Sequence, residues 1–297
     1  MSGERANLVD RIRGQINDKR SYATLRLGQL MCGEEAFGVD KLGDVEHAAA
    51  VTPGSLWERY QQLLSTAQIE LYYCGSAEEE RVARALKEAL SALPVNEGRI
   101  CPDCEVRLHA GPEPSMVEES MDVTQGKLAM GFRTGGVTCW EEEYPAMAMC
   151  NAVFGGTTLS KLFMNVREKQ SLCYYCAASY TSLTGALCVD SGVEHANAAA
   201  ARESILKELA ALCAGPVEDG ELADTKRALK NQLAAVGDTL QGLEGWYFAE
   251  RMRGADKAPE QVAAEVDAVT ADDVRRVLSS FRLSVCYTLT KEAGADA

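Results

Sequence analysis

The sequence predicts an α+β protein built from two related units that follow one another along the chain. Three observations support this prediction. The 297 residues are enough for about two domains of ordinary size. Strand-like runs with alternating apolar residues occur beside longer stretches with helical periodicity. A pattern of helix start, amphipathic helix and strand also occurs twice, once after residue 52 and once after residue 270.

The first part of the chain, residues 1–95, is predicted to be mostly helical. Residues 3–31 form one helix, or two helices with a break near Asn17-Asp18. Another helix begins at Thr52-Pro53, because threonine is a good N-cap and proline suits the first helical position. Residues 68–74 alternate as a strand, and residues 77–93 form an amphipathic helix.

A linker rich in proline and glycine is predicted over residues 96–118, followed by a complete second domain over residues 119–297. The strands predicted in this domain cover residues 126–133, 172–180 and 186–192. The predicted helices cover residues 141–153, 158–170, 195–213, 219–253 and 259–267. The helix over residues 219–253 is expected to be bent or interrupted near Gly237, Gly242 and Gly245.

The repeat is visible in short sequence matches. The triplet Ala-Val-Thr that ends at Thr52 recurs with its end at Thr270. Each threonine is expected to start an amphipathic helix, and each helix leads to a strand-like run that ends in tyrosine, over residues 69–73 and 283–287. A tandem duplication explains this pattern better than convergence does.

Charge and hydropathy exclude several classes of function. The net charge of −14 and the sequence pI of about 4.8 argue against binding to nucleic acids or to anionic membranes, because both need clustered lysine and arginine. The charged N-terminus does not resemble a secretory signal, and no apolar run is long enough to span a membrane. A cytoplasmic location is therefore expected.

The eleven cysteines are scattered through apolar segments, which is typical of reduced core residues in a cytosolic protein. Cys101 and Cys104 form a CxxC motif in the predicted linker. A zinc site there would need two further ligands, and His109 is the close candidate. We therefore interpret these two cysteines as incidental thiols, although the sequence does not define their role.

A helix-to-strand junction lies within residues 151–192. The pair Gly155-Gly156 interrupts an apolar segment, a helix then carries Arg167-Glu168-Lys169 near its end, and the strand over residues 172–180 follows. Arg167 and Tyr174, seven residues later, thus lie at the junction. This is a suitable position to hold the backbone of another chain.

Residues 167–174 resemble part of the pitrilysin/insulinase family of zinc metallopeptidases and its non-catalytic relatives. They read Arg-Glu-Lys-Gln-Ser-Leu-Cys-Tyr, which is similar to the family's second-domain pattern Arg-Glu-Lys-x-Gly-Leu-x-Tyr, with Ser171 in place of glycine. The resemblance implies tandem homologous domains, each an antiparallel sheet with helices packed on one side. Residues 17–94 resemble the later part of a first domain, which is therefore expected to be incomplete, and residues 119–291 resemble a complete second domain.

Active members of that family carry a His-x-x-Glu-His zinc motif on a helix. The three histidines here, His47, His109 and His195, are too far apart in sequence to form such a ligand pair. The family's third zinc ligand is a glutamate on a later helix that often begins with Glu-Arg. If Glu4-Arg5 aligns without gaps to that start, Arg11 falls at the ligand position, where a cation repels Zn²⁺. No catalytic and no metal-binding residue is therefore expected in this chain. Zinc is expected in the complete family enzyme or in a partner subunit.

The resemblance implies that Arg167 and Tyr174 bind substrate, by hydrogen bonds to a peptide backbone or an oxyanion. The alternative is that Arg167 pairs with a helix C-terminus or a neighbouring carboxylate. Tyr175 is expected on the opposite face of the strand. Glu168 and Lys169 are expected to be solvated.

Two further features of this segment have alternative interpretations. Gly155-Gly156 is interpreted as a helix end with positive φ, or as a loop that a substrate approaches. Residues 187–192 are a candidate strand for pairing with an extended peptide.

The leading interpretation is a peptidase-family protein without the zinc site that acts as a non-catalytic, peptide-binding or partner subunit of a zinc endopeptidase. This chain alone is predicted to be inactive. Its expected partners are an extended peptide or protein and a homologous zinc-bearing subunit, or a second copy of itself. One alternative is a fragment of an active zinc endopeptidase whose catalytic segment precedes Met1. The other is a purely structural interaction subunit.

Overall fold

The computed structural model describes residues 2–93, 106–215 and 217–291. Packing groups the chain into two compact units, each assembled from separate segments. The unit that we name the sheet unit consists of Gln15–Asp40, Glu105–Ala234 and Lys257–Ala297, and the unit that we name the helical unit consists of Met1–Gly14, Lys41–Cys104 and Ala235–Asp256. These two units are defined by packing, whereas the predicted domains are defined by their resemblance to one another in sequence, so the units do not test the predicted domain boundaries. The boundaries at residues 95 and 119 therefore stay a prediction.

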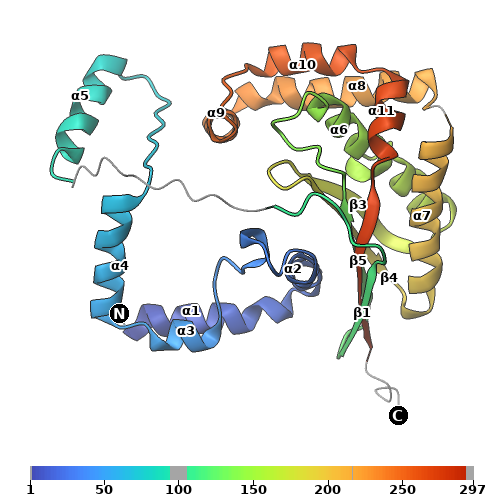
Figure 1. Ribbon diagram of the computed structural model, residues 1–297, viewed down its shortest axis with the longest axis horizontal. Coiled ribbons are helices and arrows are strands. Elements are labelled where there is room, and N and C mark those ends of the chain that lie inside the picture. Colours follow the sequence, from blue (N-terminus) through green and yellow to red (C-terminus); the bar gives the residue numbers. More distant parts are fainter. Residues whose placement is uncertain (1, 94–105, 216, 292–297) are drawn as a thin grey trace. The chain divides into compact units, whose positions relative to one another are not determined.

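The sheet unit is built on five strands (Figure 1). They are β1 (Ser115–Met121), β2 (Gly126–Arg133), β3 (Cys173–Thr181), β4 (Ala186–Val193) and β5 (Arg282–Lys291). Their order is β1-β5-β2-β4-β3, and every pairing is antiparallel except that of β1 with β5. The predicted α+β class is therefore confirmed. β1 begins inside the segment that was predicted to be linker.

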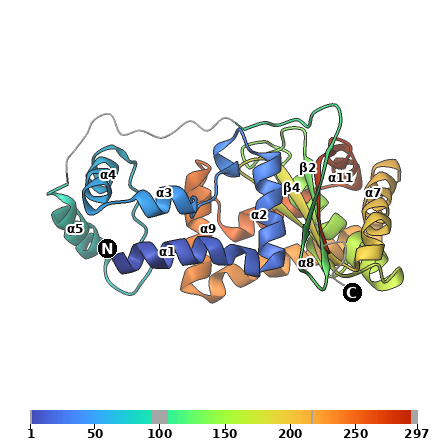
Figure 2. The same ribbon diagram turned by 90° about the horizontal axis from the view of Figure 1, so that it is seen from below.

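Most helices of the sheet unit lie on one face of the sheet (Figures 1 and 2). They are α6 (Tyr144–Asn151), η3 (Ala152–Gly156), η4 (Leu162–Lys169), α7 (Ala198–Ala214), α8 (Asp219–Ala234), α10 (Pro259–Ala268) and α11 (Ala271–Leu278), with the short η5 (His195–Asn197) before α7. Leu128, Met130 and Phe132 alternate along β2 and are fully buried beneath them. Phe132 meets Phe154 of η3 edge to face, with 6.4 Å between the ring centroids.

α2 (Lys19–Met31) packs against the opposite face of the sheet, beside β2 and β5 (Figure 2). It follows η1 (Gln15–Asn17) and is capped by Asp18, so the break predicted near Asn17-Asp18 is confirmed. Ala23 and Leu27 lie against Ala129 and other residues of this second core. A Cβ added at Gly131 would lie 2.4 Å from Met31 Sδ, so glycine allows α2 to approach the sheet. A short helical turn, η2 (Ala36–Gly38), follows α2.

The described elements of the helical unit are α1 (Ser2–Gly14), α3 (Val45–Ala50), α4 (Pro53–Thr66), α5 (Glu79–Leu90), η6 (Ala235–Asp238) and α9 (Leu240–Met252). α4 begins as predicted, because the Thr52 side chain accepts a hydrogen bond from the Ser55 backbone N–H. In the sheet unit, Thr270 caps α11 in the same way, through the Asp273 backbone N–H. The break predicted near Gly237 separates α8 from α9.

The strand predicted over residues 68–74 is wrong, because these residues form no strand in the part of the chain that the structure describes. A strand is stable only where a neighbour accepts and donates its backbone hydrogen bonds. The apolar side chains of the segment, such as Leu71 and Tyr72, are correspondingly exposed. Cys101 and Cys104 lie outside the described residues.

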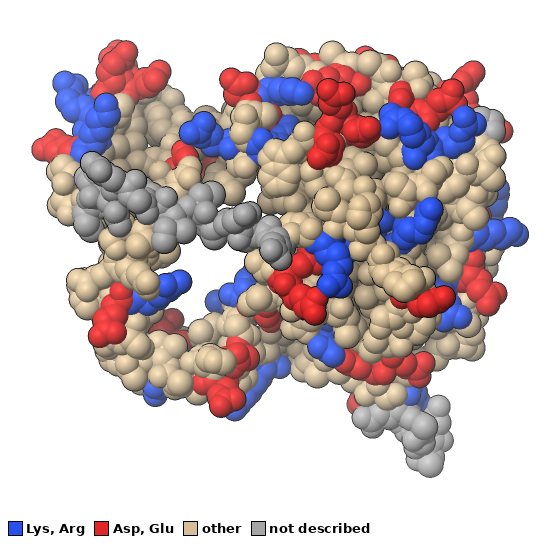
Figure 3. All heavy atoms as spheres, viewed as in Figure 1, with Lys and Arg blue, Asp and Glu red and all other residues tan. Residues whose placement is uncertain are grey.

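Charged side chains of both signs are interspersed on the face drawn in Figure 3, and the described residues there show no extended basic area. None of the helices in the described part of the chain is long and apolar enough to cross a membrane.

Candidate functional site

The predicted site lies where η4 meets β3. η4 is wound as a π-helix, a form that is frequent at functional sites. Arg167 lies near its end, with its guanidinium 4.6 Å from the centre of the Phe163 ring and Nη1 3.4 Å from a Glu168 carboxylate oxygen. The Arg167 Nε donates a hydrogen bond to the Tyr174 carbonyl oxygen at 2.9 Å. The two predicted residues are therefore in direct contact.

Tyr174 is the extra residue of a β-bulge. Along the β3–β4 ladder Cys173 lies opposite Val193 and Tyr175 lies opposite Gly192, so Tyr174 has no partner in the register. Its side chain is 56% exposed, and its hydroxyl donates to a Glu194 carboxylate oxygen at 3.2 Å. This hydrogen bond and the charge of Glu194 raise the pKa of Tyr174. The phenol therefore keeps its proton and stays a donor.

A cavity of about 350 Å³ opens beside this pair. Its lining is mainly polar and consists of Arg167, Glu168, Ser171, Leu172, Cys173, Tyr174, Glu194 and Asn197. Ser171 has a φ of 52°, in the left-handed region that favours glycine. This turn redirects the chain from η4 into β3 and so brings Tyr174 back to Arg167.

The structure settles several interpretations of neighbouring residues. Tyr175 points to the opposite face, where its ring lies 4.2 Å from the Arg20 guanidinium carbon. Glu168 is half exposed and Lys169 is exposed, as predicted. Residues 187–192 belong to β4, which pairs with β2 and β3, so their predicted pairing with a peptide is wrong. β3 is the edge strand on this side of the sheet.

Gly155 and Gly156 do not have positive φ, so their interpretation as a left-handed helix end is wrong. Gly155 is buried, and a Cβ there would lie 2.6 Å from the Ala178 Cβ and 2.8 Å from Leu162. A Cβ at Gly156 would lie 2.7 Å from the Asn151 side chain. Glycine is therefore needed at residue 155 because η3 packs directly on β3.

The described histidines lie in separate environments. His47 contacts Asp44 next to α3, and His195 Nδ1 lies 3.3 Å from the Thr290 hydroxyl. Within residues 2–93, 106–215 and 217–291, no group of three or more His, Cys, Asp or Glu side chains is arranged to hold a metal ion.

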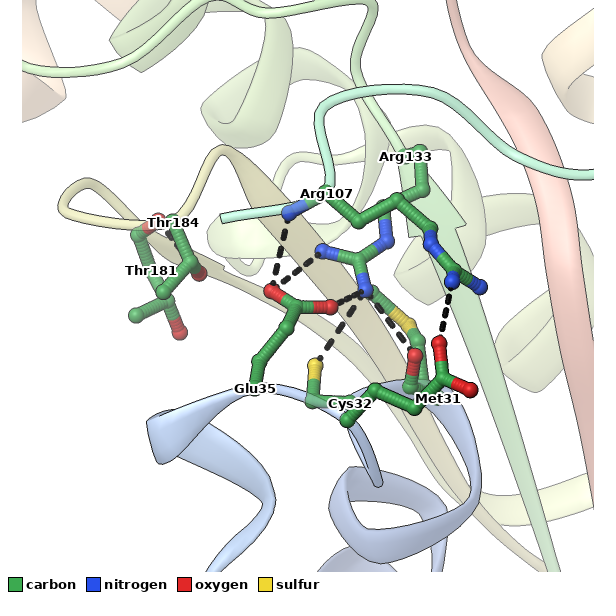
Figure 4. A network of polar contacts seen from close by, with 8 residues as sticks. Met31, Cys32, Glu35, Arg107, Arg133, Thr181 and Thr184 are labelled. Carbon is green, nitrogen blue, oxygen red and sulfur yellow. Dashed lines mark hydrogen bonds and ion pairs between the residues drawn. The ribbon is translucent and has the colours of Figure 1, made fainter. Parts of the chain in front are cut away.

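Sequence reasoning missed a buried ion pair between Glu35 and Arg133, whose side chains are 7% and 1% exposed. Arg133 ends the buried strand β2, and its Nη2 also donates to the Met31 carbonyl oxygen at 2.9 Å. Figure 4 shows the Glu35 carboxylate between Arg133 and the backbone nitrogen of Arg107, which donates to it at 3.1 Å. The signal in the sequence is a charged residue in an otherwise apolar strand. Its partner is 98 residues away, too distant for any local pattern to identify.

A second cavity, of about 230 Å³, lies between α2 and the β3–β4 hairpin. Its lining is mostly apolar and includes Leu27, Phe37 and Leu187. It contains neither Arg167 nor Tyr174, so we do not assign the predicted site to it.

Comparison with known proteins decides the family. A family model described as "Peptidase M16 inactive domain" matches residues 50–229, more than half of the chain. The chain belongs to the peptidase M16 family. The resemblance to zinc metallopeptidases is thereby confirmed, and the M16 domain matched here is the inactive one.

Individual M16 relatives agree with this assignment. The chain is 32% identical over 295 residues to a probable inactive metalloprotease of Bacillus subtilis (strain 168), covering 99% of this chain and 68% of that relative. A crystal structure of a conserved protein from Enterococcus faecalis V583 superposes with a TM-score of 0.88 at 28% identity, covering 99% of this chain and 69% of that one. A peptidase M16 inactive domain from Pseudomonas fluorescens shares the fold, with a TM-score of 0.79 at 16% identity over 100% of this chain and 71% of that structure.

Proposed function

We propose that this chain binds an extended peptide or protein segment through Arg167 and Tyr174 without cleaving it, as a non-catalytic subunit of a zinc endopeptidase. The observation that carries the proposal is the hydrogen bond from the Arg167 side chain to the Tyr174 backbone carbonyl, which holds the two residues together beside an open cavity at the edge strand β3. The inactive M16 domain and the absence of a His-x-x-Glu-His motif in this sequence support the non-catalytic part.

The chemistry of the pair suits a peptide backbone. The Arg167 guanidinium is a permanent, planar donor whose side chain is 37% exposed. The Tyr174 hydroxyl keeps its single proton and donates it to Glu194, and it becomes a directional donor to a peptide when it turns away from that carboxylate. A peptide that lies along the edge strand β3 can accept from both groups and can pair with the strand itself.

Peptide binding tests the role of Arg167. The probes are fluorescein-labelled, unstructured peptides of about 15 residues, with affinity measured by fluorescence anisotropy. Arg167→Ala removes a charge-assisted hydrogen bond and should weaken binding about 10- to 100-fold. Tyr174→Phe removes only the hydroxyl and should weaken binding less.

Arg227→Ala is the matched control, because Arg227 is also exposed, on α8 of the same unit, and pairs with Asp224. Its affinity should equal that of the unmodified chain. Unchanged binding in the Arg167 and Tyr174 variants would favour the purely structural alternative.

We further propose that the protein partner is a homologous zinc-bearing subunit, or a second copy of this chain. Four large apolar side chains on α4, Leu56, Trp57, Tyr60 and Leu63, are each about half exposed, which is typical of a protein contact surface. Zinc content and peptide cleavage should be measured on the chain alone and with co-purified partners. Stoichiometric zinc and chelator-sensitive cleavage by this chain alone would contradict the proposed non-catalytic role.

A further inference from the structure

Two cysteines of β3, Cys173 and Cys176, lie on the same face of the sheet because of the bulge at Tyr174. Residues three apart in a regular strand point to opposite faces. Here Cys173 lies opposite Val193 and Cys176 lies opposite Ser191. Val193 and Ser191 are two residues apart on β4 and share a face, so their partners share it as well.

Cys173 differs from Cys176 in its surroundings, although both residues belong to the core beneath this face. Cys173 lines the site cavity beside Arg167 and is 9% exposed, whereas Cys176 is 3% exposed and does not line that cavity. A hydrogen bond donated by the Cys176 thiol lowers the pKa of Cys173, and the same interaction raises the pKa of Cys176. Burial opposes this effect, and contact with Ser191 and the positive charge of Arg167 reinforce it. The nearby carboxylates in the cavity are those of Glu168 and Glu194.

Other thiols of the sheet unit differ from Cys173. Burial raises the pKa of Cys188, on the neighbouring strand, to about 12, and it raises the pKa of Cys32 and Cys286 as well. Such thiols stay protonated and are weak nucleophiles. Cys173 therefore combines access from a cavity with a stabilised thiolate.

We propose that Cys173 is a modification site, at which a hydroperoxide oxidises the thiolate to a sulfenic acid in the wall of the Arg167–Tyr174 cavity. The sulfur attacks one peroxide oxygen, so an S–O bond forms and the O–O bond breaks. Hydroxide leaves and takes a proton from solvent. The sulfur loses two electrons and the peroxide gains them. Arg167 then lies beside a new polar group that accepts hydrogen bonds.

Two opposing effects set the reactivity of Cys173. The lowered pKa increases the fraction of the thiol that is ionised at neutral pH, whereas the lower basicity of the thiolate reduces its intrinsic nucleophilicity. The first effect is larger, because nucleophilicity falls by only about half as much, on a logarithmic scale, as the pKa does. Cys173 should therefore react faster than Cys188, whose pKa is raised by burial.

The test uses the full chain with limiting hydrogen peroxide and dimedone, which traps sulfenic acids, followed by mass mapping of each cysteine-containing peptide. We expect the Cys173 peptide to acquire the adduct several-fold faster than the Cys188 peptide. Cys176→Ala removes the donor and should slow labelling of Cys173 several-fold, whereas Cys188→Ala should leave it unchanged. Equal rates at Cys173 and Cys188 would overturn the proposal.

A second measurement uses the unmodified chain, so its result does not depend on whether a variant folds. Iodoacetamide alkylation of Cys173 in the unmodified chain should rise with pH around a midpoint below 9.0, the ordinary value for a thiol, and a midpoint at or above 9.0 would contradict the proposal. Both readouts are masses and do not depend on the proposed function. Any loss of peptide affinity when Cys173 is oxidised would rest on the proposed peptide-binding function. The Arg167→Ala variant tests that function separately.

Discussion

Ser171 adopts a backbone conformation that costs less for glycine. Its φ of 52° lies in the left-handed region, where a side chain costs about 1–2 kcal/mol. The substitution Ser171→Gly removes this conformational strain from the folded state. The greater conformational freedom of glycine in the unfolded chain offsets part of the gain in stability. We expect a net stabilisation of about 0.5–1 kcal/mol, measured by urea denaturation.

The same substitution at Ser179 is the control, because this residue lies within β3. Glycine weakens a strand interior, so Ser179→Gly should destabilise the protein by about 0.5–1 kcal/mol. Changes of the same sign at both positions would contradict the strain argument.

A larger change in stability is expected when the buried ion pair of Glu35 and Arg133 is broken. Glu35→Ala leaves a guanidinium that is 1% exposed without its carboxylate, which should cost about 3–5 kcal/mol. The adjacent Glu34 pairs with Arg107 in solvent, with its side chain 82% exposed. Glu34→Ala should therefore cost less than about 1 kcal/mol. Thermal unfolding of the two variants makes the comparison, and similar losses would contradict this account.

At the scale of elements, α2 is held against β1 and β5 by a cluster around Glu119. Arg26 donates to Glu119 through Nε at 2.9 Å, and the hydroxyls of Tyr22 and Tyr287 donate at 3.2 and 2.7 Å. Burial raises the pKa of Glu119, but the hydrogen bonds from Arg26, Tyr287 and Tyr22 outweigh burial, and the net pKa is lowered from 4.5.

A lowered carboxylate pKa stabilises the folded state at pH values above its unfolded value, and this stabilisation is lost as the pH falls through the folded value. Acid unfolding should therefore include a contribution from Glu119 below about pH 4.5. Glu119→Gln should reduce stability at neutral pH and flatten the decline below that pH. Urea denaturation at several pH values measures both effects. The control is Glu118→Gln, because Glu118 is an exposed neighbour on β1. Its stability should fall with decreasing pH as steeply as that of the unmodified chain.

The two copies of the repeat show how far a local pattern determines an element. Thr52 and Thr270 both cap a helix, as their sequences predict. Val274 of α11 is fully buried against the sheet, whereas its counterpart Leu56 of α4 is 52% exposed. The strand after α11 is formed as β5, and the similar run after α4 belongs to none of the strands that the structure describes. Helix capping depends on neighbours within one turn, but a strand depends on partners elsewhere in the chain.

At the scale of the whole molecule, the net charge of −14 favours cationic ligands. A lysine-containing peptide should associate several-fold faster than an uncharged peptide of equal length at low salt. The difference should disappear near 0.5 M salt, since screening then acts over about 4 Å. Stopped-flow anisotropy measures these rates, and a salt-independent difference would exclude long-range attraction.

Much of the site was predictable because its signals are local. The order Arg167, Ser171, Tyr174 and the change from helical to strand periodicity all lie within a few residues. The bulge at Tyr174 was not predictable, because it depends on how β3 aligns with β4. The pairing of Arg133 with Glu35 depends on α2 packing across the sheet.

The sequence by itself determined where most helices and strands begin, which threonines cap helices, and that an arginine and a tyrosine meet at one junction. These features depend on residues close together in the chain. Only the tertiary structure decided that Cys173 and Cys176 share a face, that residues 68–74 form no strand among the described residues, and that β3 rather than β4 is the edge strand. Each of these depends on register and on strand order, which arise from hydrogen bonds between segments distant in the sequence.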